Sequence, residues 1–271
     1  MDPLDIFVLV NLYYEDSSRS LNSYSRELQL ITGTIVSVQT ISRLFLHEFP
    51  YSARLRRPNV VPIDKFCPEN MERAVEYISY VATIDPRRIK YGDEKHLKGC
   101  DVFNCYNRRN PFTGLTPPLV APPDFRNTYS LTGFCGIDRR SSPIFYSIHD
   151  GTNDSTEFQA TLLLAIEANW FHHGDILVLD NATIHYGGAN SEIEDWLWDM
   201  FQIIVLFLPP RSPELNPIEL VWNTLVQRLN LVELPVMRSI GSNSVAIMSE
   251  EILQGMSHED VEGAFRHAGV F

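Results

Sequence analysis

Apolar positions in the first fifty residues recur with helical spacing. Residues 4–14 and 23–33 place apolar side chains three or four positions apart, which predicts two short helices, the second ending near Gly33. Ser37 is expected to cap a third helix over residues 38–49. Three short helices with a tight turn before the third are typical of a helix-turn-helix, although a plain helical bundle would show the same pattern.

The third helix is the candidate recognition helix of this unit. Its early turns would project Gln39, Thr40 and Arg43 outward, where they suit base edges or phosphates. The following segment, residues 53–64, is held extended by two prolines. A basic extended arm can follow a DNA groove, and a solvated connector would look the same. The DNA contacts expected from this arm are Arg54, Arg56 and Arg57.

From residue 87 onward the pattern changes to strands alternating with helices. We expect strands over residues 87–94, 129–137, 143–151, 175–180 and 202–208, the last two fully buried. We expect helices over residues 68–84, 154–170, 191–201 and 218–229. The order predicts an α/β fold in which helices cover both faces of a mixed sheet. The predicted organisation is a helix-turn-helix domain (1–52), a basic linker with a connecting helix (53–86) and an α/β domain (87–271).

Charge is distributed unevenly along the chain. Of a net charge of −12, residues 1–90 contribute nothing, because 11 basic side chains balance 11 acidic ones. Residues 91–271 carry 11 basic and 23 acidic side chains, which suggests two parts with different roles. This acidity argues against tight, unspecific coating of DNA, although local basic clusters can still neutralise phosphates.

Two other classes of protein are disfavoured by the sequence. The apolar stretch at residues 6–14 is too short to span a membrane and follows acidic rather than basic residues, so we expect a soluble protein that is not secreted. We expect it in the nucleus if the source is eukaryotic and in the cytoplasm otherwise. The nearest approach to a zinc motif, His96, Cys100 and Cys105, has no usual ligand spacing and lacks a fourth ligand.

Three carboxylates fall where a ligand site is expected. Asp93 and Asp180 come at the ends of predicted strands, and Glu219 lies in the first turn of the helix after the proline-rich loop 209–217. Each has an ordinary explanation as a turn or first-turn residue. Three acids at one place repel each other, and a divalent cation removes that repulsion. Hard oxygen ligands favour magnesium or manganese.

The segments "LVLDNATIH" and "LPPRSPELNPIELVW" resemble the catalytic core of mariner-type transposases, which are DDE transposases with a ribonuclease-H-like fold. In that family an Asp-Asn pair ends a central strand, and a loop of the form PxxSPxLNPIE carries the third acid. This sequence matches with Asp180-Asn181 and with Pro210 to Glu219. "KYGDEKHL" supplies an Asp-Glu pair for the first acid, of which Asp93 is the closer match. The sequence predicts one helix-turn-helix unit before residue 60, where family members usually carry two.

The resemblance implies a function and a set of residues. Asp93, Asp180 and Glu219 would bind two Mg²⁺ or Mn²⁺ ions and cut DNA at transposon ends, and the freed 3′-hydroxyl would attack target DNA. The partner is double-stranded DNA, and a homodimer is expected because two ends are joined in one complex. Residues expected to support the acids are Asn181, His185 and Asn216. Further phosphate contacts are expected from Arg108, Arg109, Arg139, Arg140 and Arg211.

Two alternatives remain open. The first is a transposon-derived DNA-binding protein that has lost cutting activity, which the acidic balance favours. The second is another ribonuclease-H-like nuclease acting on RNA–DNA hybrids, and the helix-turn-helix speaks against it because that module reads duplex major grooves.

Overall fold

The computed structural model describes residues 2–15, 19–48, 62–102, 113–116, 118, 120–152, 154–181 and 193–271. The chain divides into two compact units, which are residues 1–61 (unit 1) and 62–271 (unit 2). The helix expected to connect the two domains, α4 (Pro68–Val81), belongs to unit 2 and buries Tyr77 and Val81 there.

Unit 1 contains the three helices that the apolar pattern predicts. They are α1 (Pro3–Glu15), α2 (Leu21–Thr32) and α3 (Val38–Arg43), which continues as the π-helical turn η1 (Leu44–Glu48). Gly33 ends α2 with a φ of 78°, and the Ser37 hydroxyl caps α3 by accepting from the backbone N–H of Thr40. The three elements bury one small apolar core, formed by Leu9, Leu12, Tyr24, Leu28, Val36, Ile41, Leu44 and Phe45.

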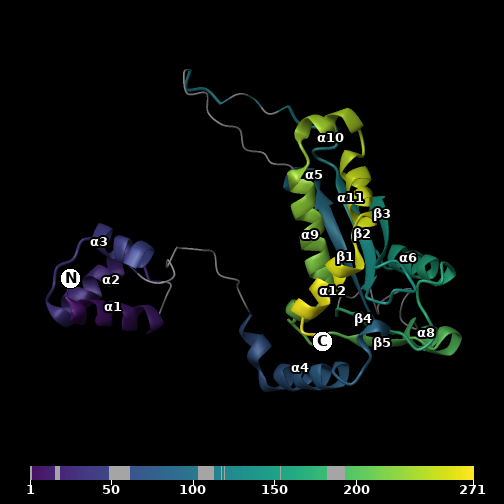
Figure 1. Ribbon diagram of the computed structural model, residues 1–271, viewed down its shortest axis with the longest axis horizontal. Helices are drawn as coiled ribbons and strands as arrows, with labels where there is room; N and C mark the ends of the chain where they lie inside the picture. Colours follow the sequence, from purple (N-terminus) through teal and green to yellow (C-terminus); the bar gives the residue numbers. More distant parts are fainter. Residues whose placement is uncertain are drawn as a thin grey trace. The chain divides into compact units, whose positions relative to one another are not determined.

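Unit 2 is built on a five-stranded mixed sheet (Figure 1). The strands are β1 (Ile89–Lys98), β2 (Thr128–Gly136), β3 (Ile144–Asp150), β4 (Ile176–Leu179) and β5 (Ile204–Phe207). Their order in the sheet is β3-β2-β1-β4-β5. The β1–β2 and β2–β3 pairs are antiparallel, whereas β1–β4 and β4–β5 are parallel. The predicted mixed sheet is therefore confirmed.

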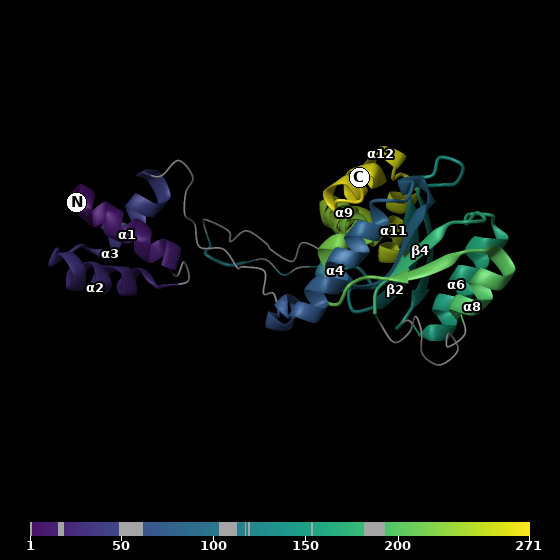
Figure 2. The ribbon, with the colours of Figure 1, turned by 90° about the horizontal axis from the view of Figure 1, so that it is seen from below.

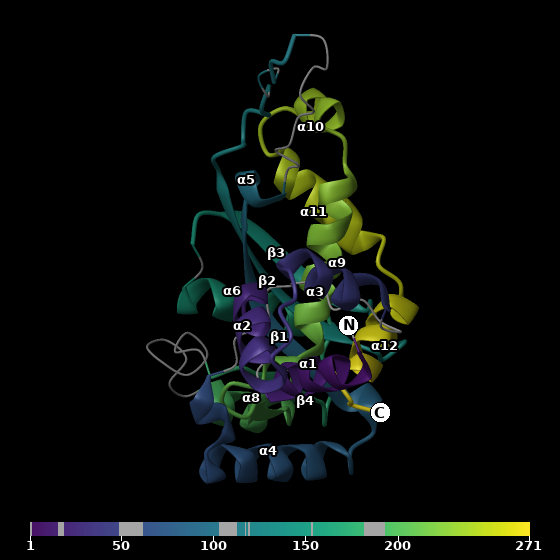
Figure 3. The same ribbon diagram turned by 90° about the vertical axis from the view of Figure 1, so that its left-hand side faces the viewer.

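Helices cover both faces of this sheet (Figure 2). One face packs against α6 (Ser155–Glu167) and α8 (Ile193–Phe201). The other face packs against α9 (Pro217–Leu231), beside which lie α11 (Ser244–Gln254) and α12 (His258–His267) (Figure 3). The remaining short elements are η2 (Ile63–Phe66), η3 (Pro86–Arg88), α5 (Gly99–Val102), η5 (Pro213–Leu215) and α10 (Leu234–Ile240).

Two strands differ from the sequence predictions. The first strand was expected to end at Asp93, but β1 runs to Lys98 because its antiparallel pairing with β2 continues to that residue. It also begins later than expected, at Ile89, since Pro86–Arg88 forms a 3₁₀ turn capped by Asp85. The strand at 202–208 was expected to be fully buried, whereas β5 is only half-buried because it lies at the edge of the sheet.

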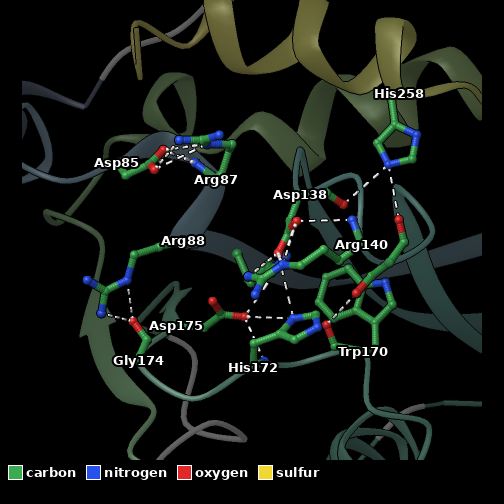
Figure 4. Close-up of polar contacts among 12 residues, drawn as sticks. Asp85, Arg87, Arg88, Asp138, Arg140, Trp170, His172, Gly174, Asp175 and His258 are labelled. Carbon is green, nitrogen blue, oxygen red and sulfur yellow. Dashed lines mark hydrogen bonds and ion pairs between the residues drawn. The ribbon is translucent and has the colours of Figure 1, made fainter.

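A buried charged cluster lies at the end of the sheet where β1 begins (Figure 4). The Lys90 ammonium is 4.0 Å from carboxylate oxygens of both Asp138 and Asp175, and it lies 4.8 Å from the centre of the Trp170 ring. The guanidinium of Arg140 forms a bidentate pair with Asp138, which lowers the pKa of that carboxyl to about 2. Burial lowers the pKa of Lys90. The cluster joins β1 to the segments that follow β2 and precede β4.

Candidate active site

Strand alternation turns Asp93 and Asp180 toward the same face of the sheet. Tyr91 packs into the core beneath α9, so Asp93, two residues further along β1, faces the same way. Val178 packs into that core too, and Asp180 follows it by two residues. The parallel ladder pairs Tyr91 with Val178, so the two acids follow the last paired positions of neighbouring strands.

Asn181 fixes the chain directly after β4. Its side-chain amide donates to the backbone carbonyl of Leu208 at 2.7 Å, and the Leu208 N–H donates to the carbonyl of Leu179 at 2.8 Å. These two hydrogen bonds tie the ends of β4 and β5 together. The Asp-Asn pair of the sequence motif thus combines an acid at the site with an amide that holds its backbone in place.

The proline-rich loop brings Glu219 to the same face. The turn η5 precedes α9, and Pro217 occupies the first position of that helix, where its missing N–H carries no cost. Ile218 and Val221 pack into the core, which leaves Glu219 half-buried in the first turn beside them. An acid is also favourable there because of the helix dipole.

The Asp93 carboxyl interacts with the other acids. It is only 8% exposed, and this burial raises its pKa to about 8. The negative charge of Glu219 is the next largest cause of the increase, and the charges of Glu94 and Asp180 add to it. Asp93 rather than Glu94 lies on the face beneath α9. Among the residues that the structure describes, no three acidic, histidine or cysteine side chains are already arranged to hold a metal ion.

Two further buried polar atoms belong to residues on either side of Glu219 in the sequence. Asn216 precedes α9 and is 4% exposed, and its Oδ1 atom has no hydrogen-bond partner within the described part of the chain. The same holds for Nε1 of the fully buried Trp222, one helical turn after Glu219. Trp222 had no predicted role, although its spacing of three residues from Glu219 puts both on one side of a helix.

The residues expected to contact DNA have different surroundings. Gln39, Thr40 and Arg43 are exposed on α3, as expected of a recognition helix. Arg211 forms an ion pair with Asp64 at 3.3 Å. Arg139 pairs with Glu259 and Glu262, and Arg140 with Asp138. Arg54, Arg56, Arg57, Arg108, Arg109 and His185 lie outside the described residues.

Comparisons with known proteins show which family model and which solved structures this chain resembles. Residues 104–235 match the family model of the DDE superfamily endonucleases. The Mos1 transposase paired-end complex with left transposon end is similar over 97% of this chain and 74% of its own, with 18% identity and a TM-score of 0.68. The Mos1 mariner paired end complex with Mn is similar over 96% of this chain and 73% of its own, with 18% identity and a TM-score of 0.67. The catalytic domain of Mos1 mariner transposase is similar over 79% of this chain and 91% of its own, with 16% identity and a TM-score of 0.51. No curated protein sequence matches this chain.

Unit 2 therefore has a ribonuclease-H-like fold, and the helices of unit 1 fit a helix-turn-helix, which confirms the predicted fold class. Residues 104–235 match the DDE superfamily endonuclease model, and the likeness to the Mos1 structures agrees with the resemblance to mariner-type DDE transposases that the motifs indicated. In the described ranges, no helix is both long and apolar enough to cross a membrane.

Proposed function

We propose that this chain is a metal-dependent DNA endonuclease that acts as a mariner-type transposase. It would hydrolyse phosphodiesters at transposon ends and join the freed 3′-hydroxyl to target DNA. The observation that carries this proposal is that Asp93, Asp180 and Glu219, from two neighbouring strands and the helix above them, share one face of the sheet. The electrostatic effect of Glu219 and Asp180 on Asp93 supports their proximity.

The donor set suits magnesium or manganese. Carboxylate oxygens are hard ligands, and the unpaired carbonyl oxygen of Asn216 beside them adds a further acceptor for a bound water. When two divalent cations are bound, they activate a water molecule and stabilise the leaving oxygen. The Mos1 mariner paired end complex is known with Mn and with Mg, which supports the same class of ion here.

The protein would supply position and charge. Asp93 would be held by its strand, Asp180 by the strand end that Asn181 secures, and Glu219 by the first turn of α9. As a metal ligand Asp93 would have to give up a proton, because burial raises the pKa of its carboxyl to about 8. His185 is assigned a supporting role on the resemblance alone.

Double-stranded DNA is the proposed substrate. The Mos1 transposase paired-end complex contains the left transposon end, and the exposed face of α3 is the part of unit 1 that suits a major groove. A homodimer is proposed because two transposon ends must be joined in one complex. Contacts from Arg54, Arg56, Arg57, Arg108 and Arg109 are proposed on their charge.

Nicking of supercoiled plasmid in Mg²⁺ or Mn²⁺ tests the proposed function without knowledge of the native ends. Asp180→Asn and Glu219→Gln should each slow nicking by at least about 100-fold, because losing even an outer-shell partner of a metal ligand costs about 10–100-fold. Glu214→Gln is the matched control, since Glu214 lies on the same loop but pairs with Lys65 at the surface. Absence of nicking by folded wild-type protein that still binds DNA would contradict the proposal.

That outcome would favour the second candidate, a transposon-derived DNA-binding protein without cutting activity. The observation in its favour is the charge of unit 2. Residues 91–271 carry 23 acidic and 11 basic side chains, and Arg139, Arg140 and Arg211 are engaged with carboxylates. These three arginines are therefore less available to DNA phosphates.

A further inference from the structure

Trp222 packs directly over the strand pairing that carries Asp93. Its indole rests on Gly133, where an added Cβ would lie 2.5 Å from Cη2 and 3.0 Å from Cζ2 of the ring. Because any larger side chain would collide with the ring, residue 133 has to be glycine for the indole to lie there. Gly133 is the residue of β2 that pairs with Asp93 of β1. The tryptophan therefore sits on the strand position opposite the most buried of the three acids.

The edge of the indole that contacts Gly133 adjoins its N–H group, because Cζ2 is bonded to the carbon that carries Nε1. Buried indole N–H groups normally have a partner. Within the described residues Nε1 of Trp222 has none, although the side chain is fully buried. A buried donor is thus available close to the acids.

We propose that Trp222 is a positioning residue of the acid site. Its ring holds α9 at a fixed distance from the β1–β2 pair, so that Glu219 faces Asp93. Its N–H donates to a carboxylate or water oxygen of the site once a divalent cation has drawn the acids together. This inference rests on the proposed function, and it assigns to Gly133 and Trp222 a joint role in metal binding.

The indole signals in a ¹H–¹⁵N spectrum of the full chain give a direct test. The chain has four tryptophans, so Trp222→Phe identifies the signal of Trp222. Trp198→Phe is the matched control, because Trp198 is 49% exposed on α8, which covers the opposite face of the sheet. On titration with Mg²⁺, the Trp222 signal should shift along a binding curve that Asp180→Asn abolishes. The Trp198 signal should stay in place.

Metal affinity separates positioning from simple packing. Trp222→Phe keeps a ring over Gly133 but loses the donor, and it should raise the Kd for Mg²⁺ about tenfold, as outer-shell partners of metal sites commonly do. Gly133→Ala keeps the donor but displaces the ring, and it should weaken Mg²⁺ binding at least as much. A residue that only packs the core would lower the melting temperature and leave the Kd of the folded protein unchanged. The shift of the Trp222 signal is read on the wild type, so this result does not depend on the stability of Gly133→Ala.

Two outcomes would overturn the inference, and they differ in what they mean for the proposed function. If Mg²⁺ binds in a way that depends on Asp180, while the Trp222 signal does not move and Trp222→Phe binds like the wild type, only the role of Trp222 is wrong. If Mg²⁺ shifts none of the four signals and Asp180→Asn binds Mg²⁺ as the wild type does, the metal site itself is wrong.

Discussion

Burial of a carboxyl group at Asp93 has a cost that depends on pH. The side chain is 8% exposed, and its pKa is raised to about 8 from the ordinary value of 3.8. The folded protein therefore binds this proton more tightly than the unfolded chain does. The proton bound to Asp93 contributes its full stabilisation of the fold below pH 3.8, and this contribution is lost as the pH rises through about 8.

Asp93→Asn should remove this dependence. In EDTA, the free energy of unfolding of the wild type should fall between pH 5 and pH 9 relative to that of Asp93→Asn, by an amount on the order of a few kcal/mol. Urea denaturation at both pH values measures the difference. Asp150→Asn, at the exposed end of β3, is the control and should follow the wild type. Parallel pH profiles for wild type and Asp93→Asn would contradict a raised pKa at Asp93.

At the scale of whole elements, sequence patterns predicted the sheet well. Alternation and apolar runs identified each of the five strands that the structure describes. The assignment of Asp180 from the strand end and of Glu219 from the loop motif stays a prediction. The length of β1 could not be predicted, because it depends on pairing with β2, which lies about thirty residues away. The sequence analysis predicted no helices after residue 231, whereas α11 and α12 pack on both α9 and the sheet. Local sequence also gave no sign that Gly133 accommodates the ring of Trp222.

The burial of Lys90 is another feature that local sequence does not predict, and its contribution to stability can be tested. A lysine at the start of a strand suggests exposure, yet Lys90 is fully buried because Asp138 and Asp175, remote in sequence, surround it. Lys90→Met would leave both carboxylates without this cation and should lower the free energy of unfolding by about 3–5 kcal/mol.

Urea denaturation at pH 7 checks this expectation for the Lys90 cluster. Lys95→Met provides the control, because Lys95 lies on the same strand but is only half-buried, and its replacement should cost much less. Equal stability of Lys90→Met and the wild type would show that the cluster contributes nothing net to the fold.

At the scale of the whole molecule, the two units differ in their balance of acidic and basic side chains. The acidic excess lies entirely in residues 91–271, and Arg139, Arg140 and Arg211 of unit 2 pair with carboxylates. Phosphates would have to compete with those carboxylates. Unit 1 has no such excess of acid, and α3 presents Arg43 on its exposed face. DNA affinity should therefore depend more on unit 1, and cutting on unit 2.

Arg43→Ala should weaken DNA binding and leave the acid site unchanged. If Arg43 contacts a phosphate, its loss should reduce the slope of log affinity against log salt by about 1. Fluorescence anisotropy with duplex DNA at several salt concentrations measures both the affinity and the slope. Arg26→Ala is the control, because Arg26 is an exposed arginine of the same unit on α2, paired with Glu27. Asp180→Asn should bind DNA like the wild type. Unchanged affinity of Arg43→Ala at every salt concentration would exclude α3 as the recognition helix, because an arginine there would then carry no part of the contact with DNA.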